Sequence, residues 1–200
     1  MNKRTKSNSI RIIAGLWRGR RLSVLDSEGL RPTTDRVRET LFNWLMHDIA
    51  GATCLDLFAG SGALGLECLS RGAARVDFVE ADQAVARNIQ QNVNLLLPEA
   101  NSKDEDSRAK INKQDALSFI KAVKDKRYDI VFIDPPFQSN LAAQSIALLQ
   151  EQGCLNDGAF VYLEQDSNHD PVQVPQSWEL YREGKAGQST YRLYIATAAE

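Results

Sequence analysis

Short apolar runs alternate with amphipathic stretches through most of the chain, between residues 53 and 163. The apolar runs are typical of buried strands, and the stretches between them repeat apolar residues at helical spacing. In chain order they predict strand 53–58, helix 63–70, strand 75–80, helix 83–96, strand 110–113, helix 116–123, strand 128–133, helix 141–150 and strand 159–163. Strands that alternate with helices indicate a mostly parallel sheet covered by helices on both faces.

The chain before this alternation predicts a β-hairpin followed by a helix. Stretches 10–13 and 20–24 are β-prone and enclose two glycines, which can supply the turn of a hairpin. The sequence Thr-Thr-Asp at 33–35 offers N-cap chemistry for a helix that extends to about residue 47. We therefore divide the chain into residues 1–30, a basic arm with the hairpin, and residues 31–200, the α/β domain.

The chain after the alternation predicts a second hairpin. Stretches 178–182 and 190–196 flank Gly184 and Gly187, a pattern that indicates two antiparallel strands at the sheet edge. The complete pattern predicts a Rossmann-like α/β fold with a mostly parallel seven-stranded sheet and helices on both faces. This fold would carry an N-terminal β-hairpin extension and a C-terminal antiparallel hairpin.

The composition is that of an ordinary folded domain, with 43% hydrophobic and 25% charged residues among 200. No apolar run approaches the roughly 20 residues that cross a bilayer, so we expect a cytoplasmic protein without a membrane partner. We expect Cys54, Cys68 and Cys154 to be reduced core thiols. Both histidines are isolated, which gives no support for a metal site or a Ser-His-Asp triad. The acidic segment 98–108 predicts an exposed loop.

The formal net charge of −2 conceals a strong asymmetry. Residues 1–38 carry ten Lys and Arg against three acids, whereas the rest of the chain carries fourteen against twenty-three. A basic arm on an acidic body predicts a polyanionic partner. The arginines expected to contact it are Arg11, Arg18, Arg20 and Arg21 on the hairpin and, closer to the site, Arg36 and Arg38. The alternative is a solvated charged tail without a partner.

A glycine-rich loop joins the first strand of the alternation to the next helix, and its residues are Ala59, Gly60, Ser61 and Gly62. Glycines let the backbone come close to a ligand, and the N-terminus of a helix favours a negative group. The loop alone would also fit a nicotinamide dinucleotide enzyme. Asp56 argues against that interpretation, because its carboxylate would repel a pyrophosphate but would suit an amine-bearing ligand.

Carboxylates occur at the ends of four successive predicted strands: Asp56, Glu80, Asp115 and Asp134. The carboxyl ends of parallel strands meet at one edge of the sheet, so we expect these side chains to line one crevice. Glu80 is placed to accept both hydroxyls of a ribose. Asp115 could accept the amino group of an adenine, while Ala116 packs against the ring or donates its backbone N–H.

The tetrapeptide Asp134-Pro135-Pro136-Phe137 follows the last buried strand of this group. Two prolines remove two backbone donors and fix φ, so the chain leaves the sheet in one stiff direction with its carbonyls free to accept. The Asp134 carboxylate adds an acceptor, and Phe137 adds a flat apolar face. Such a corner suits a planar base with an exocyclic amine. A plain Pro-Pro turn after a strand is the alternative.

These features resemble a known family. The glycine loop, the strand-end acids and the Asp-Pro-Pro-Phe sequence are similar to the ordered motifs of class I S-adenosylmethionine-dependent methyltransferases that act on exocyclic amines. Stretches 11–20 (RIIAGLWRGR), 31–45 (RPTTDRVRETLFNWL), 186–188 (AGQ) and 191–194 (YRLY) resemble the RsmD group of bacterial 16S ribosomal RNA guanine-N2 methyltransferases. The resemblance covers nearly the whole chain, and the second stretch is far more specific than the glycine loop.

The resemblance implies a class I methyltransferase with S-adenosylmethionine as cofactor, S-adenosylhomocysteine as product and no metal. The implied cofactor-binding residues are Asp56, Ala59, Gly60, Ser61, Gly62, Glu80, Asp115, Ala116 and Asp134. The implied catalytic residues are Asp134, Pro135 and Phe137.

The implied substrate is the exocyclic N2 amine of a specific guanine in 16S ribosomal RNA, free or within an assembled or assembling small subunit. The amine lone pair is delocalised into the ring, so Asp134 and the Pro135 carbonyl would accept N2–H while Phe137 stacks on the base. Whether Asp134 takes the proton or only orients the amine stays open. The target base must lie in a loop or be flipped from a stack. We expect the enzyme to act as a monomer.

Other functions remain compatible with parts of the pattern. A DNA or RNA adenine-N6 methyltransferase, or a protein-glutamine methyltransferase, shares the glycine loop and a related Pro-Pro-aromatic signature, often with Asn at the position of Asp134. A non-enzymatic RNA-binding module explains the basic arm but not the four strand-end carboxylates. A nicotinamide dehydrogenase explains only the glycine loop.

Overall fold

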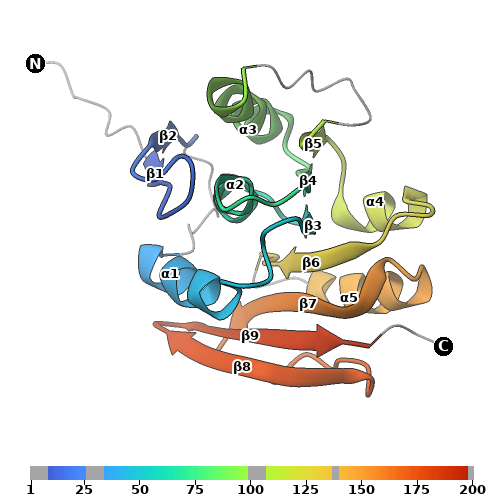
Figure 1. Ribbon diagram of the computed structural model, residues 1–200. Coiled ribbons are helices and arrows are strands. Elements are labelled where there is room, and N and C mark those ends of the chain that lie inside the picture. Colours follow the sequence, from blue (N-terminus) through green and yellow to red (C-terminus); the bar gives the residue numbers. More distant parts are fainter. Residues whose placement is uncertain (1–8, 26–33, 99–106, 137–139, 198–200) are drawn as a thin grey trace, which may run out of the picture.

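The sheet has the predicted number of strands. The computed structural model describes residues 9–25, 34–98, 107–136 and 140–197. Its seven-stranded sheet has the order β5-β4-β3-β6-β7-β9-β8 (Figure 1). Neighbouring strands are parallel from β5 to β7, and β9 and β8 run antiparallel to their neighbours. The predicted Rossmann-like fold with a C-terminal antiparallel hairpin is thereby confirmed.

The described elements keep close to the predicted ones. They are β1 Ser9–Arg11, β2 Arg21–Ser23, α1 Asp35–Trp44, β3 Thr53–Asp56, α2 Ala63–Ser70, β4 Arg75–Val79, α3 Gln83–Leu96, β5 Ala109–Asn112, α4 Ala116–Ala122, β6 Tyr128–Ile133, α5 Leu141–Glu151, β7 Leu155–Asp166, β8 Trp178–Ala186 and β9 Ser189–Ala196. The largest difference is β7, which extends beyond the predicted stretch 159–163 because it pairs with β9 as far as Asp166.

Helices cover both faces of the sheet. Helices α1, α2 and α3 lie on one face and α4 and α5 on the other (Figure 1). Successive strand residues point to opposite faces, so Cys54 packs in the core under the first group and Leu55 in the core under the second. Two buried cores therefore hold the carboxyl ends of the parallel strands in fixed positions.

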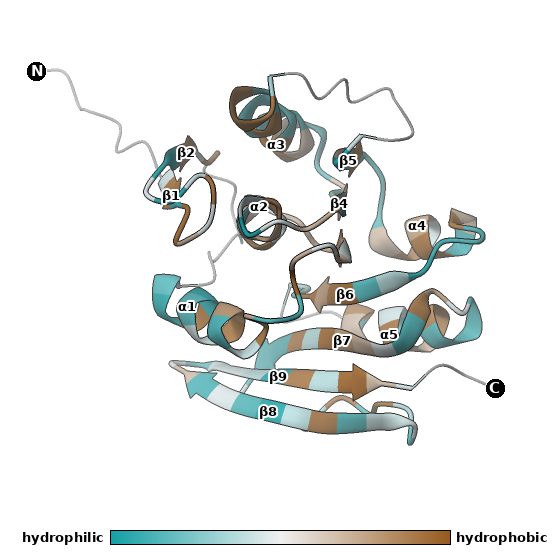
Figure 2. Ribbon diagram, in the orientation of Figure 1, coloured by the Kyte–Doolittle hydropathy of each residue, from teal (hydrophilic) through white to brown (hydrophobic). Residues whose placement is uncertain are grey.

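The C-terminal hairpin corrects one prediction, because Gly184 lies inside β8 rather than in the turn. Gly184 is paired with Tyr191 of β9, and a Cβ at this glycine would lie 2.4 Å from the Tyr191 ring. The ring covers the strand at this point and leaves space only for hydrogen. Gly187, with a φ of +59°, is the glycine of the turn. Much of the edge strand β8 is hydrophilic (Figure 2).

The N-terminal hairpin is confirmed, and it packs directly on the α/β domain. Its strands pair so that Ile10 faces Leu22, and both side chains are buried. Ile12 and Trp17 are buried in the same cluster, which continues into α1, α2 and the sheet. The hairpin lies beside α2 and α3 (Figure 1).

A buried carboxylate on α2 anchors the hairpin loop. Glu67, which is fully buried, accepts the backbone N–H groups of Ile13 at 2.8 Å and Ala14 at 2.9 Å. Gly15 has a φ of +80°, and a Cβ there would lie 1.9 Å from the Ser70 carbonyl oxygen. Only glycine allows this approach, so the loop has one docked position on the end of α2.

Other features agree with the composition. Cys54, Cys68 and Cys154 are buried free thiols, as predicted, and both histidines are exposed. Across the described ranges, no helix combines the length and apolar character that a membrane span requires. Most of the predicted loop 98–108 lies outside the described residues.

Candidate active site

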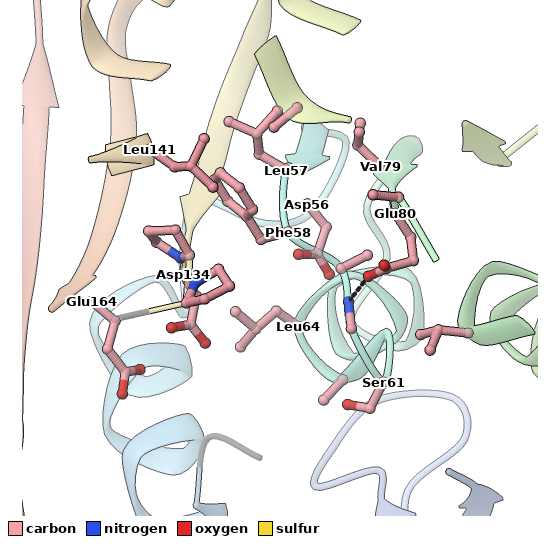
Figure 3. Close-up of a pocket in the computed structure, with 18 of the residues that line it drawn as sticks. Asp56, Leu57, Phe58, Ser61, Leu64, Val79, Glu80, Asp134, Leu141 and Glu164 are labelled. Atoms are coloured by element: carbon pink, nitrogen blue, oxygen red, sulfur yellow. Dashed lines mark hydrogen bonds between the residues drawn. The ribbon is translucent and has the colours of Figure 1, made fainter. Parts of the chain in front are cut away.

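A cavity of about 640 Å³ opens at the carboxyl ends of the parallel strands (Figure 3). A volume of this size is typical of a site for a small organic molecule. The predicted site residues that line it are Asp56, Ala59, Gly60, Ser61, Glu80, Asp115, Ala116, Asp134 and Pro135. The structure therefore brings all four strand-end acids to one cavity, as their positions in the sequence predict.

The glycine loop forms one wall of this cavity. Gly60 and Gly62 have φ values of +50° and +75°, which L side chains rarely adopt. Gly62 does not line the cavity; it begins α2 and lies against Leu66 and Ile89, where a Cβ would be 3.2 and 3.4 Å away. Its backbone conformation and close neighbours give Gly62 a structural reason for being glycine, and its contact with a ligand stays a prediction.

Asp56 is the most deeply buried acid of the site, with 2% of its surface exposed. Its Oδ2 accepts the N–H of Gly65 at 3.0 Å, in the first turn of α2. The carboxylate thus takes the place of the side-chain cap that Gly62 cannot provide. Burial raises the pKa of Asp56 to about 7, the Gly65 bond opposes that shift, and the nearby charge of Glu80 adds to it.

Glu80 organises the two loops that border the cavity. Its Oε2 accepts the N–H of Gly60 at 2.9 Å, and its Oε1 accepts the N–H of Asp82 at 2.8 Å (Figure 3 shows the first bond as a dashed line). Each carboxylate oxygen has two lone pairs, so both oxygens keep one acceptor position. Glu80 can therefore hold the loops and accept two ligand hydroxyls together.

Asp115 is the N-cap of α4 and lies at the open side of the cavity. Its Oδ1 accepts the N–H of Ser118 at 2.8 Å. Hydrogen bonds from Ser118 lower the pKa of Asp115 and so favour its charged form. The adjacent Ala116 is buried and lines the cavity, which gives this corner one acceptor and one apolar contact.

Asp134, Pro135 and Pro136 line the cavity directly after β6. Figure 3 shows the Asp134 carboxylate across the cavity from Glu80. Phe137, the fourth residue of the tetrapeptide, lies outside the described residues. The predicted catalytic corner and the predicted cofactor residues thus border the same space from opposite sides.

The predicted RNA-contacting arginines divide into two groups. Five of them are exposed: Arg11, Arg18, Arg20, Arg21 and Arg36. The prediction for Arg38 is wrong, because its side chain is only 1% exposed. Its guanidinium donates to the Arg11 carbonyl at 2.9 Å and to the Asp35 carboxylate at 2.6 Å. Arg38 therefore joins the hairpin to α1 instead of facing a partner.

The sequence analysis missed part of the cavity wall. Glu164, two residues before the end of β7, lines the cavity, and so do Thr34 at the N-cap of α1 and Ser189 at the start of β9. Glu164 directly follows the predicted apolar strand, so the rule that found the other four acids also applies to it. Thr34 and Ser189 carry no comparable signal, because only the folded chain brings their segments to the cavity.

The lining has no basic side chain among the residues that the structure describes. It combines six acidic residues with apolar surface from Leu57, Phe58, Leu64 and Val79. Three or more His, Cys, Asp or Glu side chains do not gather in metal-binding geometry anywhere in the described ranges. The cavity is thus suited to a ligand rich in hydrogen-bond donors rather than to a pyrophosphate.

Comparison with known proteins decides the family. The family model Conserved hypothetical protein 95 matches residues 10–195. A protein of Escherichia coli strain K12, Ribosomal RNA small subunit methyltransferase D, is 50% identical over 188 residues, which cover 94% of this chain and 90% of that protein. The chain belongs to this family, RsmD. Another RsmD relative of the same name, from Haemophilus influenzae, is 48% identical over 186 residues, with 92% and 93% of the two chains covered.

Solved structures agree with RsmD membership. A methyltransferase structure from Escherichia coli superposes with a TM-score of 0.86 and 46% identity over 96% of this chain and all of that one. A methylase structure from Haemophilus influenzae gives a TM-score of 0.80 and 43% identity over 95% and 99%. A more distant methyltransferase in complex with SAH, at 16% identity and a TM-score of 0.70, shares the fold over 98% of this chain and 57% of its own.

Proposed function

We propose that this chain transfers a methyl group from S-adenosylmethionine to the N2 amine of a guanine in 16S ribosomal RNA of the small subunit. The observation that carries the proposal is one cavity bordered by Asp134 and Pro135 on one side and by the other strand-end acids on the opposite side. Relatives of 48–50% identity named as small-subunit ribosomal RNA methyltransferases support the substrate. An RNA of this kind implies a cytoplasmic enzyme.

The cofactor side of the cavity fits a nucleoside with a charged amine. Glu80 offers one acceptor position on each oxygen for the two ribose hydroxyls, and Asp115 accepts the adenine amine. Asp56 lies beneath the glycine loop, where an ammonium group would stabilise its ionised form. When bound, S-adenosylmethionine supplies an electrophilic methyl group. The absence of basic side chains from the described lining argues against a dinucleotide with its pyrophosphate.

The substrate side of the cavity holds and orients the amine. Asp134 and the Pro135 carbonyl accept the N2–H protons, which turns the nitrogen lone pair toward the cofactor side. A rigid Pro-Pro segment keeps these acceptors at fixed positions, because both prolines restrict φ. Alignment of the two reactants then supplies much of the rate, and Asp134 would either receive the proton that the amine loses or only orient the amine. Phe137 is proposed to stack on the base.

The hairpin supplies the phosphate contacts in this proposal. Arg11 of β1 lies opposite Arg21 of β2, and both side chains are exposed. Like charges directly opposite each other destabilise a strand pair, so a phosphate between them would offset the repulsion. Residues 1–30 would thus carry RNA contacts and residues 31–200 the chemistry.

Mapping the methylated nucleotide tests the proposed function. Total ribosomal RNA and assembled small subunits are incubated with methyl-labelled S-adenosylmethionine, and the labelled nucleotide is identified. We expect N2-methylguanine in 16S RNA, and at least about a hundredfold loss of turnover in Asp134→Asn with unchanged cofactor affinity. Asp170→Asn, a matched exposed aspartate, should behave as wild type. Label on an adenine, on DNA or on protein would replace the proposal with that activity.

The role of the hairpin needs substitutions rather than a deletion. Removing residues 1–24 would also remove the buried side chains of Ile10, Ile12, Trp17 and Leu22 and expose the core that they cover. The double variant Arg11→Gln/Arg21→Gln keeps those side chains. This variant should weaken RNA binding with cofactor affinity unchanged. The slope of the logarithm of the RNA-binding constant against the logarithm of salt concentration should fall by an amount that corresponds to up to about two phosphate contacts. An unaltered salt slope would refute the assignment.

A further inference from the structure

Glu164 stands beside Asp134 on the substrate side of the cavity, and nothing described so far gives it a role. Strands β6 and β7 are parallel, and Ile133 is paired in register with Leu163. The next residues along the chain, Asp134 and Glu164, therefore also lie next to each other. Both side chains line the cavity, and Figure 3 shows their carboxylates extending to the same side. Neighbouring strands are about 4.8 Å apart, which is close enough for two acids to meet one edge of a single base.

The Glu164 carboxylate keeps acceptor capacity toward the cavity. The residue is only 6% exposed, and Tyr162 donates its hydroxyl to Oε2 at 2.7 Å. Within the described ranges this is its one hydrogen bond, and no ion pair includes it. A buried carboxylate is costly unless donors surround it, so a ligand that brings donors would be bound favourably.

The nearest basic residue along β9 does not neutralise Glu164. Arg192 pairs in register with Leu163, one position before Glu164, and therefore lies on the other face of the strand. Its guanidinium donates to Glu183 at 2.6 Å and to Gln165 at 3.0 Å. Glu164 is thus held by Tyr162 on one side and faces the cavity on the other.

The chemistry of purines decides what such a carboxylate can select. Guanine presents N1–H next to its N2 amine, so its Watson–Crick edge offers adjacent donors. Adenine presents a lone pair at N1, and a carboxylate would repel it. Recognition of an extruded base through this edge is common among enzymes that act on bases. Two adjacent carboxylates, one for the amine and one for N1–H, match guanine and reject adenine.

We propose that Glu164 accepts the N1–H of the target guanine and makes the site specific for guanine over purines with an unprotonated N1. This inference rests on the proposed function, because it requires a guanine bound with its N2 amine at Asp134. Glu164 is then a specificity-determining residue that touches the substrate, while Tyr162 positions it.

The test uses 16S RNA with guanine or 2-aminopurine at the methylated position, assembled into subunits where the enzyme requires them. 2-Aminopurine keeps the exocyclic N2 amine, but it has a lone pair at N1 and lacks the O6 carbonyl, so the comparison with the Glu164 variants assigns the preference to N1. We expect the wild type to prefer guanine at least about a hundredfold in kcat/KM. In Glu164→Gln, the amide can donate to the N1 lone pair, so this ratio should fall at least about tenfold.

The controls separate recognition from a structural role. Glu164→Asp keeps a carboxylate and should keep the guanine preference at lower kcat/KM, and Glu179→Gln, at an exposed position on β8, should change neither value. A structural role predicts that Glu164→Gln slows both substrates equally, and an unchanged ratio would overturn the proposal. Equal use of both RNAs by the wild type would also overturn it, whether or not the variant folds. Failure of the proposed function is distinct: the wild type would then methylate neither RNA at N2.

Discussion

Replacing Asp56 with asparagine should stabilise the folded protein at alkaline pH. Burial raises the pKa of Asp56 from its usual 3.8 to about 7, so the folded state favours the protonated acid. The stability that the protonated Asp56 contributes to the folded state is present in full below about pH 4 and is lost as the pH rises through 7. A difference of this size corresponds to about 4 kcal/mol in total, of which roughly 2.5 kcal/mol is lost between pH 5 and 8.

The asparagine variant removes the titration but keeps an oxygen that can accept from Gly65. Urea unfolding of Asp56→Asn and wild type is compared at about pH 5 and about pH 8, and the difference in free energy of unfolding should grow by roughly 2.5 kcal/mol in favour of the variant. Asp170→Asn removes an exposed aspartate and should follow the wild type. Parallel pH dependences for wild type and Asp56→Asn would refute the reasoning.

The same carboxyl should link protons to cofactor binding. An ammonium group next to Asp56 favours its ionised form, so binding at about pH 6 should release a proton in the wild type. Calorimetry in buffers of different ionisation enthalpy measures this release. We expect no release in Asp56→Asn, together with weaker binding. Equal proton release in both proteins would place the amine elsewhere in the cavity.

Three further predictions concern the hairpin anchor and the glycine loop. Glu67→Gln removes a buried charged acceptor, so it should lower the free energy of unfolding by about 2 kcal/mol and increase hydrogen exchange in the hairpin loop. Unchanged hydrogen exchange would show that the Glu67 carboxylate does not anchor the loop. Gly15→Ala should cost at least about 2 kcal/mol, since its Cβ meets the Ser70 carbonyl, and an unaltered Tm would contradict the docked loop. Glu80→Gln should weaken cofactor binding at least about tenfold in calorimetry while Gly60 remains bonded, whereas undiminished affinity would remove Glu80 from the ribose site.

Local sequence patterns were sufficient for the fold where each element carried its own signal. Helix α2 and strand β6 begin and end where their apolar spacing predicts, because their flanking residues are glycine, proline and charged side chains. Gly184 shows the limit of this reasoning. A glycine indicates a turn only when no packing contact needs a residue without a side chain at that position. At Gly184, inside β8, the ring of Tyr191 leaves no space for a side chain, and Tyr191 is seven residues away in the sequence.

The candidate site was predictable to the extent that topology fixes positions. Parallel strands bring their carboxyl ends together, so Asp56 and Glu80 could be assigned to one crevice from their places in the chain. The burial of Arg38 could not be predicted, because an arginine in a basic segment has the same sequence signal whether it faces solvent or the Arg11 carbonyl. Only the packed hairpin distinguishes the two.

Helix α2 connects the basic hairpin to the glycine loop. Its N-terminus begins at the glycine loop, its second half holds the hairpin through Glu67 and Ser70, and all eight of its residues are buried. A helix of this length spans about 12 Å and does not stretch, so the distance between the hairpin and the glycine loop is fixed. A Cβ at Gly65 would lie 2.3 Å from the Phe78 ring, which leaves the helix no space to shift toward the sheet. The proposed enzyme would therefore select its guanine by two features: the Watson–Crick edge of the base and its distance from the phosphates bound at the hairpin. Only a base at the correct distance from these phosphates could reach Asp134.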